Sequence, residues 1–446
     1  MDALEQSDRR WRQPLPAASL SVGVTVDLEL AAGAGGHVKC WQRIAEAAAA
    51  ADGCDLTVYF LGPESKTIAL GDQVRYRIVP PRRGTRGLGL RNTPGHTDLA
   101  RRNPAIGPML LRHDVLHTTG PFALSGSAAH VSARALKPLV SSVHTDNPAL
   151  TRHYMPEVMS ALCGGFPACG AAARWLGLPE LGERHMAARV ARGLAAAWHL
   201  LHSNMAQRDA FRRTFPETQR SRMRRGIDRH RFNPGLRDRV RLRARFDIPA
   251  LRPVLAFAGR IDTSKNAGLV ADTAAVLWSS GLDFTLLMLG EGALRETLVR
   301  RCGPRAVLPG LVPQQDLAWM LASADAFIFP SETETVGNAA LEAKASGLPL
   351  FVMAGTAPGE AVQRDGEDGV MIAGRDPAQW ARAIAPVLAD AAQLNRHRRA
   401  ARHSAAQLPS WQEVLEQDLI PIWCRLAGRV PLGSTAWERQ SAEAAD

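Results

Sequence analysis

The feature that most constrains the fold is an alternation of short apolar runs with helical periodicity, which begins near Ser19 and restarts after residue 238. The first unit joins the apolar run "SLSVGVTVDLEL", through a glycine loop, to the helical pattern "KCWQRIAEAAAAA". Strands that alternate with helices favour a parallel sheet with helices on its faces. The sequence therefore predicts an α/β fold with two βαβ domains of similar size. The predicted strands lie within residues 19–30, 55–62, 74–81, 113–122, 137–148, 195–204, 220–228, 253–260, 283–292, 305–312, 326–331, 348–353 and 369–374.

The chain has 446 residues, which is more than one ordinary core holds. We expect an N-terminal domain over residues 1–234, a C-terminal domain over residues 235–410 and a final segment over residues 411–446. The stretch "PSWQEVLEQDLIPIWCRLA" predicts a terminal helix that packs back across both domains. Ligands of open α/β sheets bind beyond the carboxyl ends of the strands, so the two domains are expected to face each other across a cleft.

Basic residues exceed acidic ones, giving a formal net charge of +11, and only five of the 54 basic residues are Lys. The basic residues are densest between residues 208 and 245, which suggests contact with phosphate or an anionic membrane, or simply an Arg-favouring composition. The six scattered Cys suit reduced thiols in the cytoplasm and match no metal-ligand spacing. The polar N-terminus and the lack of about 18 uninterrupted apolar residues predict neither a secretory signal nor a membrane span.

Carboxylates gather where the apolar run "AFIF" gives way to a predicted helix, in "PSETETVGNAALEAKASGLPL". Glu334 precedes that helix, and Glu342 lies five residues beyond Gly337, or roughly 7–8 Å along a helix axis. One ligand spans such a distance, with Glu334 and Glu342 accepting hydrogen bonds from sugar and ribose hydroxyls. A helix-capping acid beside a solvated one is the alternative, and for an isolated Glu pair it is the stronger interpretation.

Two cations flank the next predicted turn, in "FAGRIDTSKN". Arg260 follows a predicted strand and Lys265 begins the following helix. Cations beside a helix N-terminus are typical of a phosphate or diphosphate site, although a solvated surface pair has the same pattern.

The N-terminal half offers a glycine loop and two histidines at strand ends. The loop "GAGGHV" has Val38 where a dinucleotide fingerprint needs glycine or alanine, so it favours an anion-binding turn over a nicotinamide site. A flexible turn without a ligand fits this segment equally well. His117 and His144 each end a predicted strand. A lone histidine there is more often structural, but two on adjacent loops raise the chance that one meets a ligand.

No Asp-x-Asp triplet occurs in the chain. Enzymes that hold a nucleotide diphosphate through Mg²⁺ or Mn²⁺ usually need such acids. The sequence therefore predicts no metal and no other cofactor, with cations and helix N-termini neutralising a diphosphate instead.

These motifs, taken in order, resemble the retaining, metal-independent GT-B glycosyltransferases of glycosyltransferase family 4. The resemblance is strongest from residue 253 to residue 376, where the two glutamates have the family's paired-glutamate spacing. It extends more loosely to "GAGGHV", "DVLHTTGPF", "SSVHTDNP" and "RRGIDRHRFNP". It implies a GT-B architecture, with two Rossmann-like βαβ domains facing each other across a cleft.

The resemblance also implies how the donor is bound. The positions that correspond to the family's contacts with the donor diphosphate are Arg260, Lys265, Gly35 and Gly36, and the ribose position is Glu342.

The donor sugar would lie against Glu334 and the backbone around Val336, Gly337 and Asn338, with His144 beside the reacting carbon. Glu334 and His144 are thus the catalytic candidates.

The chain departs from the family at two positions of this motif. Val336 stands where Phe is common and is expected to alter the sugar pocket, whereas Lys344 stands where Met is common and is expected to face away from the ligand.

The implied activity is transfer of a hexose from a UDP- or GDP-sugar to a lipid-linked or saccharide acceptor, with retention of anomeric configuration and no nucleic-acid partner. The alternatives are a sugar-nucleotide epimerase or a phosphorylase on the same fold, or a catalytically silent, basic surface-binding protein. With only five Lys, a pyridoxal-dependent phosphorylase is disfavoured, and the intact cation and glutamate set argues against a silent relative.

We further expect a cytoplasmic enzyme that docks on the inner face of an anionic membrane. The basic run 208–245 and the apolar segment "MPEVMSALCGGFPACGAAARWLGL" motivate this hypothesis. An Arg-rich solvated surface with a buried helical hairpin is the alternative.

Overall fold

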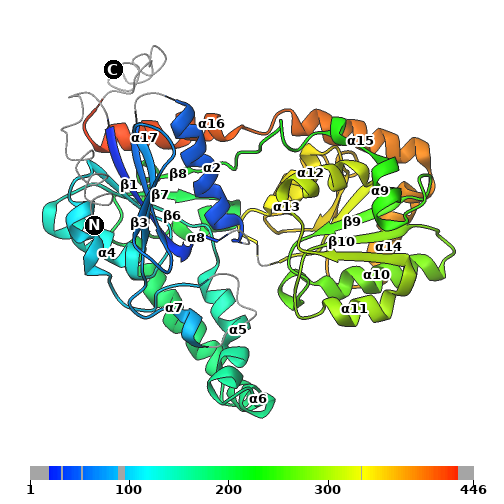
Figure 1. Ribbon diagram of the computed structural model, residues 1–446, viewed down its shortest axis with the longest axis horizontal. Coiled ribbons are helices and arrows are strands. Elements are labelled where there is room, and N and C mark those ends of the chain that lie inside the picture. The colour runs from blue at the N-terminus through cyan, green and yellow to red at the C-terminus, as the bar shows by residue number, and fades with distance from the viewer. Residues whose placement is uncertain (1–19, 32–33, 52–53, 89–95, 333, 430–446) are drawn as a thin grey trace.

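A computed structural model describes residues 20–31, 34–51, 54–88, 96–332 and 334–429. Two α/β domains lie side by side, each built on its own sheet (Figure 1). This confirms the predicted fold class. Among the helices of these residues, none is both long and apolar enough to cross a bilayer.

The N-terminal sheet has eight strands in the order β3-β4-β2-β1-β5-β6-β7-β8. Every neighbouring pair is parallel except β3 with β4, which is antiparallel. Strand β1 is buried over its first eight residues and lies at the centre of the core. The strands are β1 (Leu20–Glu29), β2 (Cys54–Leu61), β3 (Lys66–Ala69), β4 (Val74–Val79), β5 (Val115–Thr118), β6 (Leu139–Ser142), β7 (His199–His202) and β8 (Arg220–Arg222).

Only β3 among these strands lies outside the predicted ones. It is a four-residue edge strand with no fully buried position, so it shows no buried apolar run. The helices of this half are α2 (Gly36–Ala50), α3 (Gly107–Leu110), α4 (Ala123–Ala135), α5 (Asn147–Leu162), α6 (Pro167–Trp175), α7 (Leu178–Leu194) and α8 (Met205–Phe211).

The C-terminal sheet is entirely parallel, with six strands in the order β11-β10-β9-β12-β13-β14. Strand β9 lies in its middle and is buried throughout. The strands are β9 (Val254–Ala258), β10 (Thr285–Leu289), β11 (Ala306–Gly310), β12 (Ala326–Phe329), β13 (Leu350–Met353) and β14 (Gly369–Ile372). The helices are α9 (Arg239–Phe246), α10 (Ala267–Ser279), α11 (Arg295–Cys302), α12 (Gln314–Ser323), α13 (Asn338–Ala345), α14 (Pro377–Ala389) and α15 (Ala391–Ala405).

The end of the described chain returns to the N-terminal domain. Helix α15 lies on the C-terminal domain, and the chain then crosses to α16 (Trp411–Val414), a π-helical turn (Leu415–Leu419) and α17 (Ile420–Leu426) (Figure 1). Ser410 and Glu413 form a capping box that begins this segment. Its apolar face belongs to the same core as β1, β2 and α2, so residues at the far end of the chain complete the first domain.

Trp423 anchors this segment. Its side chain is fully buried, and its indole N–H donates to Nδ1 of His117 at 3.3 Å. We predict that Trp423→Ala lowers the free energy of unfolding of the N-terminal domain by about 3–5 kcal/mol, because it leaves a large cavity. Chemical denaturation measures the loss, with Trp198→Ala, at a half-exposed position, as the matched control. Equal unfolding midpoints for the two variants would contradict the prediction.

Candidate active site between the domains

Two loops of the C-terminal domain meet because their strands are neighbours in a parallel sheet. One loop follows β9 and carries Arg260 and Lys265, and the other follows β12 and carries Glu334. Lys265 Nζ lies 2.6 Å from Glu334 Oε1 in an ion pair, and the Asn266 side chain donates to the Pro330 carbonyl at 2.8 Å. The structure thus brings together three predicted donor-binding side chains.

Arg260 is held by groups from both domains. Its guanidinium pairs with Asp262 at 2.9 Å and donates to the Ser264 hydroxyl at 3.0 Å. It also donates to the phenol oxygen of Tyr154, which lies on α5 of the N-terminal domain. Sequence reasoning missed Tyr154, because nothing in a helical pattern more than a hundred residues upstream indicates that contact.

Glu342 lies on α13, the helix that follows the loop carrying Glu334. It lines a cavity of about 30 Å³ together with Lys39 and Arg43 of α2 and Gln314 of α12. Burial raises the pKa of Glu342 to about 7, and the nearby Lys39 and Arg43 lower it only in part. Arg43 donates to the Gln314 side chain at 2.7 Å, so this corner also joins the two domains.

Glycines allow the close approach of backbone in this cleft. Gly337 has φ +76° at the start of α13, and a Cβ there would lie 2.8 Å from Pro358. A Cβ on Gly36 would lie 2.5 Å from the amide nitrogen of Asn338, which donates to the Gly36 carbonyl at 3.4 Å. Gly35 precedes α2 with open space around its Cα. Val336 is partly buried against the C-terminal core.

His144 follows β6 on the opposite side of the cleft. Its ring stacks on His37 with centroids 4.6 Å apart, and its Nε2 lies 2.7 Å from the Ser142 hydroxyl. The Arg225 guanidinium lies 3.3 Å from Nδ1. Burial lowers the pKa of His144 well below its ordinary value, and His37 and Arg225 lower it further. The imidazole is therefore neutral and only weakly basic at physiological pH, and its low basicity suits a hydrogen-bonding role better than that of a general base.

The other strand-end histidine lies inside the core. His117 is fully buried between Trp41 and Trp423, and its Nε2 lies 2.8 Å from the Ser142 hydroxyl. Burial lowers its pKa to about 3. Of the two histidines, only His144 is at the domain boundary, where its carbonyl accepts a hydrogen bond from Thr335.

Further contacts hold the two domains against each other. The Asn204 side chain donates to the Thr335 carbonyl at 2.8 Å, and the Met205 N–H donates to Glu360 at 2.9 Å. Arg222 pairs with the same glutamate at 3.3 Å. Polar groups from both domains therefore meet beside the candidate site.

Lys344 is part of the fold of the C-terminal domain. Its side chain is fully buried, pairs with Asp368 at 2.9 Å and donates to the Ala361 carbonyl. Burial lowers the pKa of Lys344, although the Asp368 carboxylate opposes this shift. A lysine is tolerated here because Asp368 supplies the charge that a buried ammonium requires.

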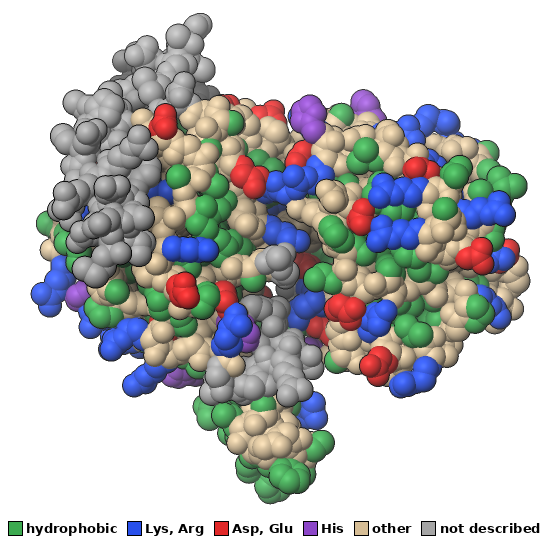
Figure 2. All heavy atoms as spheres, viewed as in Figure 1, with side chains coloured by type: hydrophobic (Ala, Val, Ile, Leu, Met, Phe, Trp, Pro, Cys, Tyr) green, Lys and Arg blue, Asp and Glu red, His purple; other side chains and the backbone are tan. Residues whose placement is uncertain are grey.

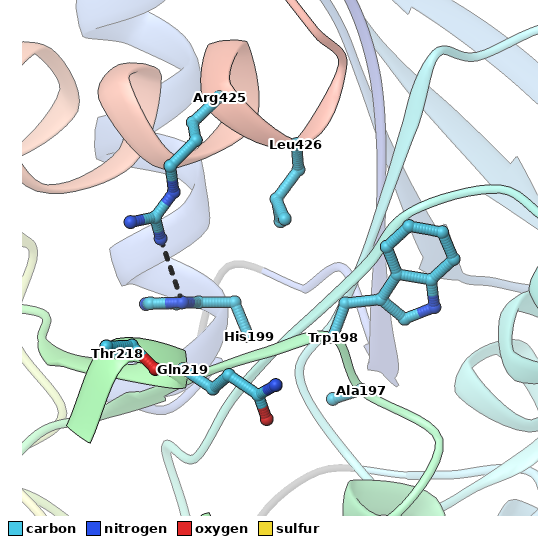
Figure 3. Close-up of a pocket in the computed structure, with 7 residues that line it drawn as sticks. All are labelled: Ala197, Trp198, His199, Thr218, Gln219, Arg425 and Leu426. Atoms are coloured by element: carbon cyan, nitrogen blue, oxygen red, sulfur yellow. Dashed lines mark hydrogen bonds between the residues drawn. The ribbon is translucent and has the colours of Figure 1, made fainter. Parts of the chain in front are cut away.

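A larger cavity of about 550 Å³ lies elsewhere, where β7 and β8 begin (Figure 3). Arg425 reaches across it to Nδ1 of His199 at 3.1 Å. It contains none of the predicted site residues. Within the described ranges, no group of three His, Cys, Asp or Glu side chains is arranged to hold a metal ion.

Comparison with known proteins supports the assignment of the C-terminal domain. Residues 252–390 match the family described as "Glycosyl transferases group 1". The chain is 33% identical over 216 residues to D-inositol 3-phosphate glycosyltransferase of Salinispora tropica, a match that covers 44% of each protein. It is 32% identical over 189 residues to GDP-mannose-dependent alpha-(1-6)-phosphatidylinositol dimannoside mannosyltransferase of Mycobacterium tuberculosis, covering 42% of this chain and 48% of that protein. The chain thus spans about half the length of these curated relatives.

Solved structures share the whole two-domain fold at low sequence identity. Sucrose-phosphate synthase from Thermosynechococcus elongatus superposes with a TM-score of 0.64 and 17% identity, covering 96% of this chain and all of that one. The Anabaena protein HepE, in complex with UDP and glucose, gives a TM-score of 0.64 and 14% identity over 90% and 98% of the two chains. The fold is that of the GT-B glycosyltransferases. Residues 252–390 match the group 1 glycosyltransferases, the family that the motifs of this region resemble.

The raised pKa of Glu342 predicts a specific pH dependence of stability. Its folded-state pKa of about 7 exceeds the ordinary 4.5, so between these values the native protein keeps a proton that the unfolded chain loses. The stabilising contribution is complete below the lower value and is lost as the pH rises through 7. Relative to Glu342→Gln, the wild type should lose roughly 3 kcal/mol across this window. Denaturation curves measured at several pH values check this, and parallel pH profiles for the two proteins would contradict it.

Proposed function

We propose that this protein transfers a hexose from a UDP- or GDP-sugar to a lipid-linked or saccharide acceptor, with retention of anomeric configuration and without a metal. The observation that carries the proposal is the ion pair between Lys265 and Glu334. It joins a residue predicted to bind the diphosphate to a residue predicted to bind the sugar. The N-terminal domain contacts the segment after Glu334 through Gly36, which accepts from Asn338, and His144, which accepts from Thr335.

Charge stabilisation of the leaving diphosphate is the main task of such a site. Arg260 and Lys265 supply two positive charges at the carboxyl edge of the sheet. A donor diphosphate would compete with Asp262 and Glu334 for these cations. Glu334, released from Lys265, would then accept hydrogen bonds from sugar hydroxyls, and neutral His144 would contribute a hydrogen bond near the reacting carbon.

The names of the relatives support nucleotide-sugar donors and a lipid or inositol-type acceptor. One relative is named for GDP-mannose and a phosphatidylinositol dimannoside, and another for D-inositol 3-phosphate. Binding of UDP is described for the Anabaena protein HepE. For this chain we propose the shared chemistry only, namely a sugar joined to a nucleoside diphosphate and an acceptor hydroxyl.

We place this activity in the cytoplasm. All six cysteines are free, and four of them are buried. Reduced thiols of this kind suit a reducing compartment.

Metal independence is the first test. We predict that donor hydrolysis, screened with UDP- and GDP-sugars, persists in EDTA, because arginine, lysine and helix N-termini neutralise the diphosphate. A metal-replete sample is the control. Complete loss of activity in chelator, with recovery on adding Mn²⁺, would refute this part of the proposal.

The cations are the second test. Arg260→Ala and Lys265→Ala should each lower turnover by at least about tenfold to a hundredfold, because each removes charge stabilisation from the leaving group. Arg252→Ala is the matched control, since Arg252 pairs with Asp283 on the same domain at 3.1 Å, outside the cleft. Steady-state kinetics of donor hydrolysis give the comparison. Turnover near the wild-type value in both cleft variants would show that the diphosphate binds elsewhere.

A further inference from the structure

A helical spur projects from the N-terminal domain. Helices α5, α6 and α7 form it, with α5 packed against both of the others, and it extends away from the two sheets (Figure 1). Residues 162–176, here called the tip, occupy its far end. The buried-hairpin alternative for this segment is therefore wrong, because most of the tip is exposed.

The tip exposes large apolar side chains. Leu162 is 57% exposed, Phe166 68%, Trp175 87% and Leu176 61%. Figure 2 shows hydrophobic side chains gathered at the end of the spur. Together these four side chains expose roughly 500 Å² of mostly apolar surface, which is in the range that marks an interaction site.

Local packing explains why the aromatic residues point outward. Gly170 lies so close to α5 that a Cβ there would be 2.7 Å from the Pro156 carbonyl, and Ala173 on the same helix is also buried. The face of α6 that carries Gly170 and Ala173 therefore packs against α5 and is unavailable to the aromatic side chains. Gly164 and Gly165 turn the chain with φ of +72° and +90°, and Phe166 follows that turn at the outer end.

Charge along the spur is layered. Arg174 is the only charged residue in the tip. Arg152 lies ten residues before Leu162 on α5, or about 15 Å along the helix, and pairs with Glu180 at 3.3 Å and with Glu183 at 3.5 Å on α7, the helix that follows the tip. An apolar end with a single cation, followed by a polar girdle, matches the change from acyl chains through phosphates to water at a bilayer surface.

We infer that the tip inserts into the boundary between headgroups and acyl chains of a lipid bilayer. A second copy of the chain is the weaker occupant, because each partner of a stable dimer buries about 800 Å², more than these four apolar side chains expose. A convex end also suits a fluid surface, and the positive Arg174 complements lipid phosphate.

Much of the basic run 208–245, by contrast, is paired with acids of the protein itself. Its arginines form ion pairs with carboxylates on several elements, including Arg224 with Asp418 at 2.8 Å and Arg237 with Asp325 at 2.8 Å. Arg241 and Arg245 both pair with Asp316. The run extends from the N-terminal sheet to α9 on the other domain, so attachment rests on apolar insertion and not on this charge.

Insertion at the tip would hold the cleft near the membrane. Tyr154, which touches Arg260, lies two turns before Leu162 on the same helix, or about 12 Å along it. This suits an acceptor whose hydroxyl is attached to a lipid. That consequence rests on the proposed function, whereas the docking itself does not.

Vesicle co-sedimentation tests the docking. We expect the full chain to bind phosphatidylcholine vesicles as well as vesicles containing phosphatidylserine, with little weakening by salt. The double variant Phe166→Ser with Trp175→Ser should bind at least about tenfold more weakly, because it removes the two largest apolar side chains. Trp198→Ser with Leu251→Ser is the matched control, since both residues are exposed outside the spur and should leave binding unchanged. Unfolding midpoints equal to wild type confirm that the variants fold.

Three outcomes would overturn the inference: equal binding by the two double variants, binding to anionic vesicles alone that salt abolishes, or no binding to either vesicle. A dimer that sedimentation equilibrium detects and that the tip variant loses would assign the tip to a second copy instead. Donor hydrolysis on the same samples keeps the proposals apart. If the tip variant keeps donor hydrolysis but loses vesicle binding, the result supports insertion of the tip. If the wild type binds vesicles but hydrolyses no UDP- or GDP-sugar, the result counts against the proposed function only.

Discussion

Parallel pairing of strands is the constraint from which the candidate site follows. In a parallel sheet every strand delivers its following loop to the same edge. Strands β9 and β12 are direct neighbours, so Lys265 and Glu334 meet although they are far apart in sequence. The same rule in the N-terminal sheet brings the loops after β1 and β6 to the cleft, where the ring of His37 stacks on that of His144.

Polar groups in the cleft are stabilised mainly by one another. Arg260 has Asp262, Lys265 has Glu334, and His144 is enclosed by Ser142, His37 and Arg225. Burial of a charge is costly without a partner. Arg260 and Lys265 accordingly each lie beside an acid, and the buried imidazole stays neutral. Groups arranged in this way are ready to exchange partners when an anionic ligand competes for the cations.

Most strands and the paired loops were predictable, because apolar runs and polar loop ends are local signals. Strand β3 was not, since it is short, at an edge and without a fully buried position. The contact between Tyr154 and Arg260 also gave no signal, because it joins two domains across more than a hundred residues. Lys344 gave no signal of its burial either, because that burial depends on Asp368, a partner 24 residues away. The direction in which Lys344 would face a bound donor stays a prediction.

The basic run shows that composition does not reveal which charges are paired within the fold. Its arginines suggested a membrane-facing charge, but several of them pair with Asp316 on α12, Asp325 before β12 and Asp418 in the C-terminal segment. Pairing of this kind is invisible until the fold places the acids.

The exposed apolar tip was equally hidden, since its sequence also fits a buried hairpin. Gly170 decides between a buried hairpin and an exposed tip. Its close approach to α5 packs one face of α6 against that helix and leaves Phe166 and Trp175 exposed. Helix α5 therefore links both features: one end of it carries the tip, and Tyr154 near its middle contacts the cation that the donor diphosphate would need.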